Sequence, residues 1–211
     1  MSDTLVIDTH TNSMRVVEKD YTIEEYKQQG RWPFDYIAGK GLVKVVNDHA
    51  NKLGRSVVGL EIGVCKAENI VHFLENCDKI EKIYCMDPYM PYMDWTGPVT
   101  QETVNEHKRI ALKNLEPWMD KIDFTVATST DSVSRFADEF FDYIFIDGDH
   151  SYEATKQDIR NYYSKVKKGG IFAGHDINLP EVARAAIEIC QEIGIKEIRT
   201  TETNVWFWEK P

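Results

Sequence analysis

From residue 56 onward, short apolar runs alternate with longer segments in which apolar residues recur every three or four positions. The short runs predict buried strands, and the longer segments predict amphipathic helices. Strands are expected at residues 56–63, 82–87, 122–127, 141–146, 171–174, 195–201 and 205–208, and helices at residues 66–77, 100–115, 132–139, 152–166 and 180–193. This alternation predicts an α/β fold with a doubly wound, mostly parallel seven-stranded sheet.

The first 55 residues follow a different pattern. Residues 1–20 are polar and mixed, which suits a loose arm or a short edge hairpin. Thr22 followed by Glu25 is a capping box that predicts a short helix, and residues 41–53 predict an amphipathic helix. We therefore expect an N-terminal helical extension at residues 1–55 and one α/β domain at residues 56–211.

Composition narrows the function. A net charge of −10 argues against binding to nucleic acid or to an anionic membrane, because both need a basic surface. No apolar run is long enough to cross a bilayer, and the first residues lack the pattern of a secretory signal. The four cysteines, Cys65, Cys77, Cys85 and Cys190, form no CxxC pair, so each is expected to be a free buried thiol. A cytoplasmic enzyme is the expectation.

Polar residues follow two expected strands that a helix separates, at residues 141–146 and 171–174. These polar residues are Asp147, Asp149 and His150 after the first strand, and His175 and Asp176 after the second. In a parallel βαβ unit the carboxyl ends of both strands lie at one sheet edge, so the five side chains should converge.

Such a cluster suits metal-assisted proton removal. Carboxylates are ligands for a hard cation such as Mg²⁺, and an imidazole can take a proton from a substrate hydroxyl. We predict Asp147, His175 and Asp176 as metal ligands, and His150 with Asp147 as catalytic residues. A zinc site ranks lower because no cysteine joins the cluster. Alternatively, the two histidines only cap or pair locally.

The first expected strand ends in Glu61-Ile62-Gly63, with Ala67 four residues after the glycine. The turn after this strand meets a nucleotide-like ligand in doubly wound folds, and glycine allows close approach of the backbone. A GxGxxG fingerprint is absent, which counts against NAD or FAD. An acid before the glycine suits a positively charged ligand such as S-adenosylmethionine (SAM). The alternative is a core strand with a polar end.

Two further positions are candidate cofactor contacts. Asp87 ends the second strand, where a carboxylate can accept hydrogen bonds from both ribose hydroxyls. Ser129 follows the third strand and is placed to meet an adenine. The alternatives are a solvated acid at residue 87 and simple helix caps at residues 128–130.

At these residues the chain resembles class I SAM-dependent methyltransferases, and in particular the family that includes metal-dependent O-methyltransferases of macrolide sugars. The resemblance covers residues 56–209. It rests on Glu61-x-Gly63, Asp87-Pro88-Tyr89, Ile146-Asp147-Gly148-Asp149-His150-Ser151-Tyr152-Glu153, and Gly169-Gly170 followed by His175-Asp176. The long Ile146–Glu153 block is the specific part, whereas the first motif is generic.

The resemblance implies a role for each matched residue. Glu61 and Gly63 would face the methionine part of SAM and Asp87 its ribose, while Asp147 and Asp176 would hold magnesium and His150 would be the general base. It also implies that residues 205–208 are inserted antiparallel in the sheet. The sequence departs from the family at Ala67, usually glycine, at Asn69, usually serine, and at His175, where relatives tend to carry an acid.

Aromatic residues are the candidates for a lid over the acceptor. They are Trp32, Phe34 and Tyr36 from the extension and Tyr89, Tyr92 and Trp95 from residues 88–98, a stretch whose three prolines predict an irregular loop. The same rings suit a contact between subunits of a homo-oligomer.

The hypothesis is methyl transfer from SAM to a hydroxyl of a small molecule or sugar. Two alternatives remain: a SAM-binding or interaction module of the same fold without turnover, and a nucleotide-dependent enzyme of another class, such as a dehydrogenase.

Overall fold

A computed structural model describes residues 5–8, 13–16, 40–94 and 97–211 of the chain. Nine strands form one sheet in the order β2-β1-β10-β11-β9-β8-β3-β4-β7. They are β1 (Leu5–Asp8), β2 (Ser13–Val16), β3 (Val57–Ile62), β4 (Ile80–Met86), β7 (Ile122–Thr125), β8 (Phe141–Ile146), β9 (Val166–Gly174), β10 (Glu197–Thr200) and β11 (Trp206–Glu209). Strands β5 (Tyr92–Asp94) and β6 (Gly97–Val99) form a separate hairpin.

The sheet is parallel except near one side. Strands β3, β4, β7, β8 and β9 pair in parallel, and β11 is antiparallel to both of its neighbours, β9 and β10. The seven strands from β10 to β7 thus confirm the doubly wound sheet predicted from the sequence, with its last strand reversed and inserted. The β1–β2 hairpin pairs with β10 and widens this sheet to nine strands.

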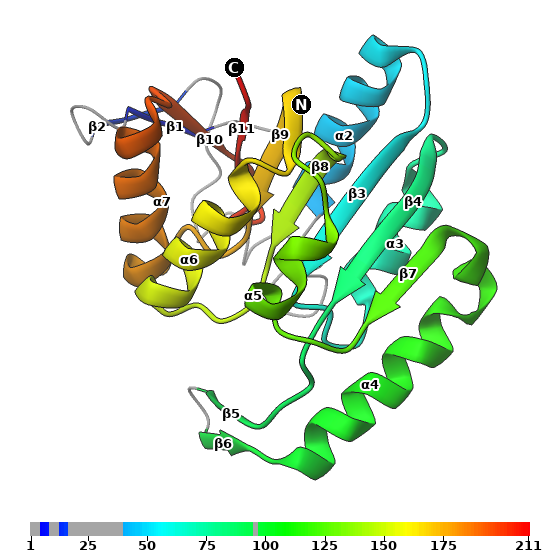
Figure 1. The fold of residues 1–211 in the computed structure, drawn as a ribbon. Helices are drawn as coiled ribbons and strands as arrows, with labels where there is room; N and C mark the ends of the chain where they lie inside the picture. The colour runs from blue at the N-terminus through cyan, green and yellow to red at the C-terminus, as the bar shows by residue number, and fades with distance from the viewer. Residues whose placement is uncertain (1–4, 9–12, 17–39, 95–96) are drawn as a thin grey trace, which may run out of the picture.

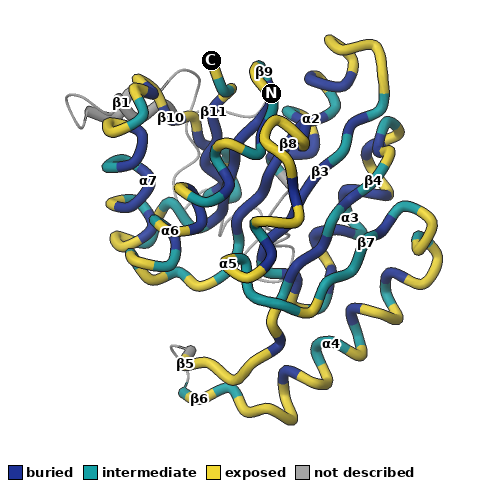
Figure 2. The backbone as a smooth tube through the Cα atoms, in the orientation of Figure 1, coloured by how far each residue is buried: buried dark blue, intermediate teal, exposed yellow. Residues whose placement is uncertain are grey.

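Helices cover both faces of the sheet (Figure 1). The α-helices are α2 (Lys40–Leu53), α3 (Glu68–Asn76), α4 (Gln101–Leu115), α5 (Ser129–Ser132), α6 (Tyr152–Tyr163) and α7 (Pro180–Ile193), and 3-10 turns span Glu116–Lys121 and Val133–Arg135. One buried cluster joins α2, α3 and α4 to the sheet, and a second joins α6 and α7 to its other face. The central strands are therefore buried along most of their length, as Figure 2 shows.

The N-terminal region is not helical throughout. Residues 5–8 and 13–16 are strands of the main sheet, and α2 buries Leu42, Val46 and Ala50 in the core. The edge hairpin is thus confirmed, whereas the short helix expected after Thr22 lies outside the described residues. The domain boundary at residue 55 stays a prediction.

Two local predictions were wrong. The loop expected at residues 88–98 contains the β5–β6 hairpin, where Pro98 lies opposite Met93. A two-stranded ribbon is all edge, so the missing N–H of a proline costs it little. The helix expected at residues 132–139 begins instead at Ser129, because the Thr128 side chain caps it. The chain becomes extended at Phe136, whose ring packs against Phe141.

The strand expected at residues 171–174 is also longer than predicted, because β9 begins at Val166. The backbone N–H of Gly169 donates to the carbonyl of Lys210, and the N–H of Lys210 donates to the carbonyl of Gly170. The pairing of β9 with β8 is irregular in this stretch. The glycine pair is therefore part of an irregular strand.

All four cysteines are free thiols. Cys77, Cys85 and Cys190 are buried as predicted, but Cys65 is exposed, because it lies in the loop between β3 and α3 and not in the core. Among the described residues, none of the helices combines the length and the apolarity that a bilayer crossing requires.

Candidate active site

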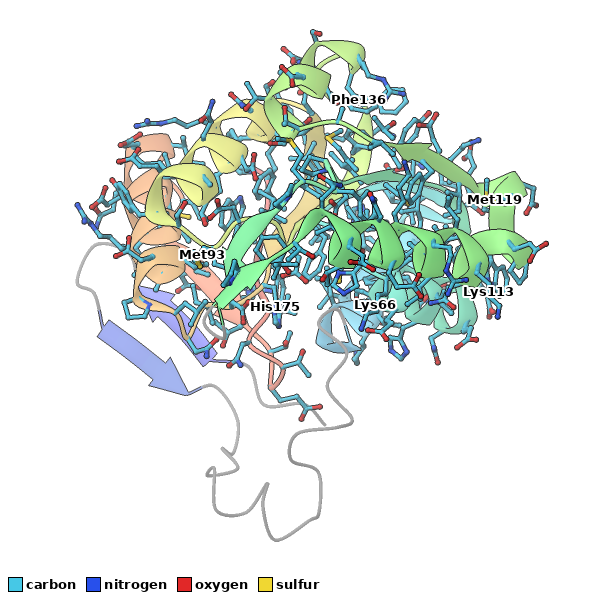
Figure 3. The ribbon with its side chains drawn as sticks, turned by 90° about the horizontal axis from the view of Figure 1, so that it is seen from below. Lys66, Met93, Lys113, Met119, Phe136 and His175 are labelled. Carbon is cyan, nitrogen blue, oxygen red and sulfur yellow. The ribbon has the colours of Figure 1, made fainter. Side chains whose placement is uncertain are left out.

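Backbone hydrogen bonds align the ends of the parallel strands. The N–H of Asp147 donates to the carbonyl of Ile62 (2.7 Å), the N–H of His175 to the carbonyl of Ile146 (2.9 Å), and the N–H of Gly63 to the carbonyl of Met86 (2.8 Å). Residues 63, 87, 147 and 175 therefore follow their strands at one level of one edge. Figure 3 looks onto this edge from below and labels His175.

Gly63 is the point where two of these strand ends touch. Its φ is 88°, and a Cβ at this residue would lie 2.0 Å from the carbonyl oxygen of Asp147. Real Cβ atoms do not approach an oxygen so closely, and side chains disfavour this φ. Only glycine fits at residue 63, and its absent side chain lets the two loops meet.

Four of the five side chains predicted to converge form one cluster, whereas Asp149 is exposed and its Oδ1 atom accepts a hydrogen bond from the backbone N–H of Ser151 (2.8 Å). The Nε2 atom of His150 lies 3.5 Å from Oδ1 of Asp147 and 3.1 Å from Oδ2 of Asp176. The Nδ1 atom of His175 lies 3.4 Å from the same Oδ1 and 3.1 Å from the same Oδ2. Two carboxylates thus lie between two imidazoles, with His150 on the more exposed side.

Backbone contacts fix His175 in place. Its side chain is 5% exposed, and its Nε2 atom lies 3.0 Å from the carbonyl oxygen of Thr203 in the turn before β11. The indole N–H of Trp206 donates to the carbonyl of His175 (2.9 Å). The reversed hairpin of the sheet therefore orients the imidazole, a contribution that nothing in the local sequence indicated.

Asp176 adopts a backbone conformation that L-residues rarely take, with φ at 56°. Aspartate tolerates the left-handed region better than most residues, but the conformation still costs energy. The resulting turn follows β9 directly and brings the carboxylate of Asp176 within 3.1 Å of both imidazoles. Strain at a site of converging charges is typical of a functional position.

The carboxylates and the imidazoles of the cluster stabilise one another's charged forms. Burial opposes the charge on Asp147, yet hydrogen bonds from His150 and His175 keep the pKa of this carboxyl below its usual value. The bond with Asp147 raises the pKa of His150. Burial opposes protonation of His175, but its bonds with Asp147 and Asp176 raise its pKa to about 10. The carboxylate of Asp147 is thus held in the charged form.

Three residues of the cluster have a donor set that fits a divalent cation. One ligand atom from each of Asp147, His175 and Asp176 lies within 4.8 Å of the other two. Two carboxylate oxygens and one imidazole nitrogen are ligands that divalent ions accept, and three protein ligands leave coordination positions for substrate. The geometry is compatible with the predicted ligand set.

Glu61 is buried at the end of β3 beside this cluster. Its Oε2 atom accepts a hydrogen bond from the side-chain amide of Asn69 (2.6 Å). Burial and the charge of Asp147 raise the pKa of Glu61 well above its usual value, and only the amide opposes this shift. Asn69, noted in the sequence only as a departure from the family, is thus the direct partner of Glu61.

The loop after β3 folds around Asp87. The backbone N–H groups of Val64 and Cys65 donate to its Oδ2 (2.9 and 3.0 Å), and the N–H of Tyr89 donates to its Oδ1 (2.7 Å). Ala67, at the start of α3, has a φ of 61°, which explains why glycine is usual at this position. Asp87 therefore fixes the loop, and its Oδ1 atom, which accepts one of these three bonds, keeps a lone pair for a ligand hydroxyl.

Ser129 lies at the start of α5 and contacts a residue that sequence reasoning missed. Its hydroxyl donates to Oδ1 of Asp158 on α6 (2.5 Å), and its carbonyl accepts from the hydroxyl of Tyr162 (2.7 Å). Burial raises the pKa of Asp158 to about 6, together with the nearby charge of Asp149. The available signal was the acid at a core position of the α6 pattern, three residues after Thr155 and one before Ile159.

The aromatic lid is only partly described. Tyr89 is buried, stacks on Phe124 and donates its hydroxyl to the carbonyl of Cys65, so it is part of the framework and not a lid. Tyr92 and Met93 are exposed on the β5–β6 hairpin, which lies below the sheet in Figure 1. The other lid candidates, Trp32, Phe34, Tyr36 and Trp95, lie outside the described residues.

Comparison with solved structures supports this fold. The O-methyltransferase NovP is 18% identical, with a TM-score of 0.57 over 89% of this chain and 88% of that one. A candidate caffeoyl-CoA O-methyltransferase from Staphylococcus aureus is 14% identical, with a TM-score of 0.56 over 91% of this chain and 93% of that one. At such identities the likeness shows the fold alone.

A search of curated proteins gave no match. A family model described as a methyltransferase domain matches residues 60–177, which is more than half of the chain and includes every candidate site residue. The chain therefore belongs to this methyltransferase family and has the fold of the class I SAM-dependent enzymes.

Proposed function

We propose that this methyltransferase transfers the methyl group of SAM to a hydroxyl of a small molecule or sugar, with help from a divalent cation and a histidine base. The observation that carries the proposal is the cluster at the ends of β8 and β9. A methyltransferase that only positions two reactants has no need of two carboxylates between two imidazoles. A hydroxyl acceptor explains both, since it must lose a proton as the new bond forms.

The cofactor side of the site is formed by Glu61, Gly63, Ala67, Asp87, Ser129 and Asp147. The carboxylate of Glu61 suits the positive amino group of the methionine part, and Gly63 leaves room for it. The remaining lone pair on Oδ1 of Asp87 suits a ribose hydroxyl. Ser129 is assigned to the adenine. These residues follow neighbouring strands of the sheet, so one extended ligand can reach them all.

The acceptor side is formed by the metal ligands and the base. A divalent cation held by Asp147, His175 and Asp176 would lower the pKa of a hydroxyl bound to it. The imidazole of His150 would take the proton, and the contact of its Nε2 atom with Asp176 (3.1 Å) stabilises the imidazolium that results. The sulfonium is already reactive, so the protein acts mainly through alignment.

The first test is calorimetry of the full chain with SAM and with its demethylated product. Binding of either ligand is expected, and the failure of both would remove the basis of the proposal. Transfer of a labelled methyl group to a panel of sugars, phenols and amines, with Mg²⁺ or Mn²⁺ present, then tests the acceptor class. Transfer to amines alone would contradict the O-methylation proposed above.

His150→Ala tests the base. We expect a rate about 100- to 10,000-fold lower with the affinity for SAM retained, because general-base catalysis contributes in this range. His72→Ala is a matched control: its ring is on α3, contacts Asn76, and belongs to no proposed site. An unchanged rate in the His150 variant would assign the proton transfer to another group.

A further inference from the structure

His175 gives the proposed metal centre a nitrogen ligand beside the carboxylates of Asp147 and Asp176. We infer that the centre prefers a divalent transition ion such as Mn²⁺ over Mg²⁺, because His175 coordinates the ion through Nδ1. This inference rests on the proposed function and deepens it. It concerns which ion the site selects, whereas the proposal above requires only that a divalent cation binds.

The direction of the imidazole is the first argument. The carbonyl oxygen of Thr203 can only accept a hydrogen bond, so the Nε2 atom 3.0 Å away carries the proton of the ring. In the neutral ring, Nδ1 then presents a lone pair to Asp147 and Asp176, which also present lone pairs. A proton on Nδ1 can occupy the point between them as a hydrogen bond to the carboxylates, and a divalent ion that binds here displaces that proton and takes its place.

This arrangement is the usual one for metal-binding histidines. Such residues donate their outer N–H to a carbonyl or carboxylate, which fixes the tautomer and turns the other nitrogen toward the metal. Here the outer partner is a backbone carbonyl, and no side-chain substitution at residue 203 removes that oxygen. The nitrogen ligand is therefore built into the turn between β10 and β11.

The position of His175 is fixed on several sides. The side chain is 5% exposed, and the backbone N–H and carbonyl of the residue bond to Ile146 and Trp206. Turning the imidazole away from the ion would break its contact with the carbonyl of Thr203 in a nearly fully buried position. A bound cation must accept the nitrogen or coordinate less well.

Ions differ in how they respond to this constraint. Mg²⁺ prefers an octahedral shell of oxygen atoms and gives up its water reluctantly, whereas imidazole suits the first-row transition ions. A site with two carboxylates and one imidazole therefore favours Mn²⁺ over Mg²⁺ more strongly than a site with three carboxylates. The imidazole decides the size of that preference.

The test compares the wild-type chain with His175→Asp, which makes all three ligands carboxylates. Any affinity tag is removed and the protein is freed of metal by chelation. Binding of Mn²⁺ is measured by electron paramagnetic resonance, and Mg²⁺ is measured by competition. Mn²⁺ is used instead of Zn²⁺ because the exposed thiol of Cys65 is a second ligand for zinc.

We expect the ratio of Mg²⁺ to Mn²⁺ dissociation constants to fall about tenfold or more in His175→Asp, since ligand changes of this kind alter affinity by roughly 10- to 100-fold. Electron spin echo modulation from ¹⁴N is expected for Mn²⁺ in the wild type and not in the variant. Equal ratios, or no nitrogen coupling in the wild type, would overturn the inference.

Two measurements keep the outcome decisive. If His175→Asp does not fold, the nitrogen coupling of the wild type still decides the question, and His175→Gln provides a neutral oxygen ligand of similar size. Calorimetry with SAM on the same samples separates the two proposals. A chain that binds SAM but lacks the nitrogen coupling loses only the metal preference, whereas a chain that does not bind SAM loses the proposed function.

Discussion

The two ends of β8 each hold a largely buried acid, and the surroundings of the two acids are opposite. At the start of the strand, Asp142 accepts hydrogen bonds from the guanidinium of Arg55 (2.6 and 3.0 Å), the ammonium of Lys167 (2.9 Å) and the backbone N–H of Val58 (2.9 Å). Just beyond its end, Asp147 contacts the imidazoles of His150 and His175.

The difference separates a structural acid from a functional one. Arginine and lysine keep their charge at any physiological pH, so Asp142 is permanently neutralised, and these bonds hold its pKa below the usual value despite burial. The imidazoles of His150 and His175 can give up a proton or bind a metal ion, so Asp147 belongs to a group whose charge can change. One strand thus anchors the fold at one end and presents chemistry at the other.

Removal of Asp142 is expected to have the largest effect on stability. Asp142→Ala leaves two cations and one N–H without their common partner. Loss of a buried ion-pair partner costs about 3–5 kcal/mol, and we expect about 3 kcal/mol because Arg55 and Lys167 are partly exposed. Urea unfolding measures the change. Asp138→Ala, which removes an exposed acid paired with Lys165, should lower the free energy of unfolding far less.

The surroundings of Asp158 are intermediate between those of Asp142 and Asp147. Its hydrogen-bond donor is the hydroxyl of Ser129. Its pKa of about 6 in the folded chain exceeds that of the unfolded chain, so the unfolded state loses its proton first. Stability should fall as pH rises from about 4 to about 6 and should then stay level. The Asp158→Asn variant should not show this fall in stability.

Unfolding at pH 4 and at pH 8 checks that expectation. Between pH 4 and pH 8, the free energy of unfolding of the variant should rise by about 2 kcal/mol relative to that of the wild type. This change is less than the full free energy of a two-unit pKa shift. Glu153→Gln is the control, because this acid on the same helix is exposed. A constant difference between variant and wild type at both pH values would show that Asp158 has an ordinary pKa.

Glu61 is another buried acid, and its hydrogen-bond partner is the neutral amide of Asn69. Because burial raises the pKa of Glu61, we expect Glu61→Gln to leave the free energy of unfolding unchanged or to raise it by up to about 1 kcal/mol. The affinity for SAM should fall at least about tenfold, because a charged hydrogen bond is lost. A destabilised variant with unchanged SAM affinity would make Glu61 structural, like Asp142.

Much of the site followed from the order of residues along the chain. Apolar runs of strand length that end in Gly63, Asp87, Asp147 and His175 had to bring these residues to one edge, because parallel strands share the edge at which they end. The need for glycine at residue 63 has the same origin. The family resemblance then assigned the residues their roles.

Other features needed contacts that no local pattern contains. The sequence predicted an irregular loop where β5 and β6 pair, and it offered Tyr89 as a lid although the ring packs inside. Whether an aromatic residue closes a site or supports it depends on which neighbours reach it. Its own position in the chain does not decide this.

The sequence by itself determined the sheet, the edge that carries the chemistry and the acids and imidazoles at that edge. Strand periodicity can be read locally, and the alternation of strands and helices along the chain indicates a parallel sheet. Only the tertiary structure decided how those groups are used. The carbonyl of Thr203 turns Nδ1 of His175 toward two carboxylates, and Arg55 and Lys167 neutralise Asp142 but do not reach Asp147. Each of these pairings joins segments far apart in sequence, and hydrogen-bond direction and burial fix them only once the chain has folded.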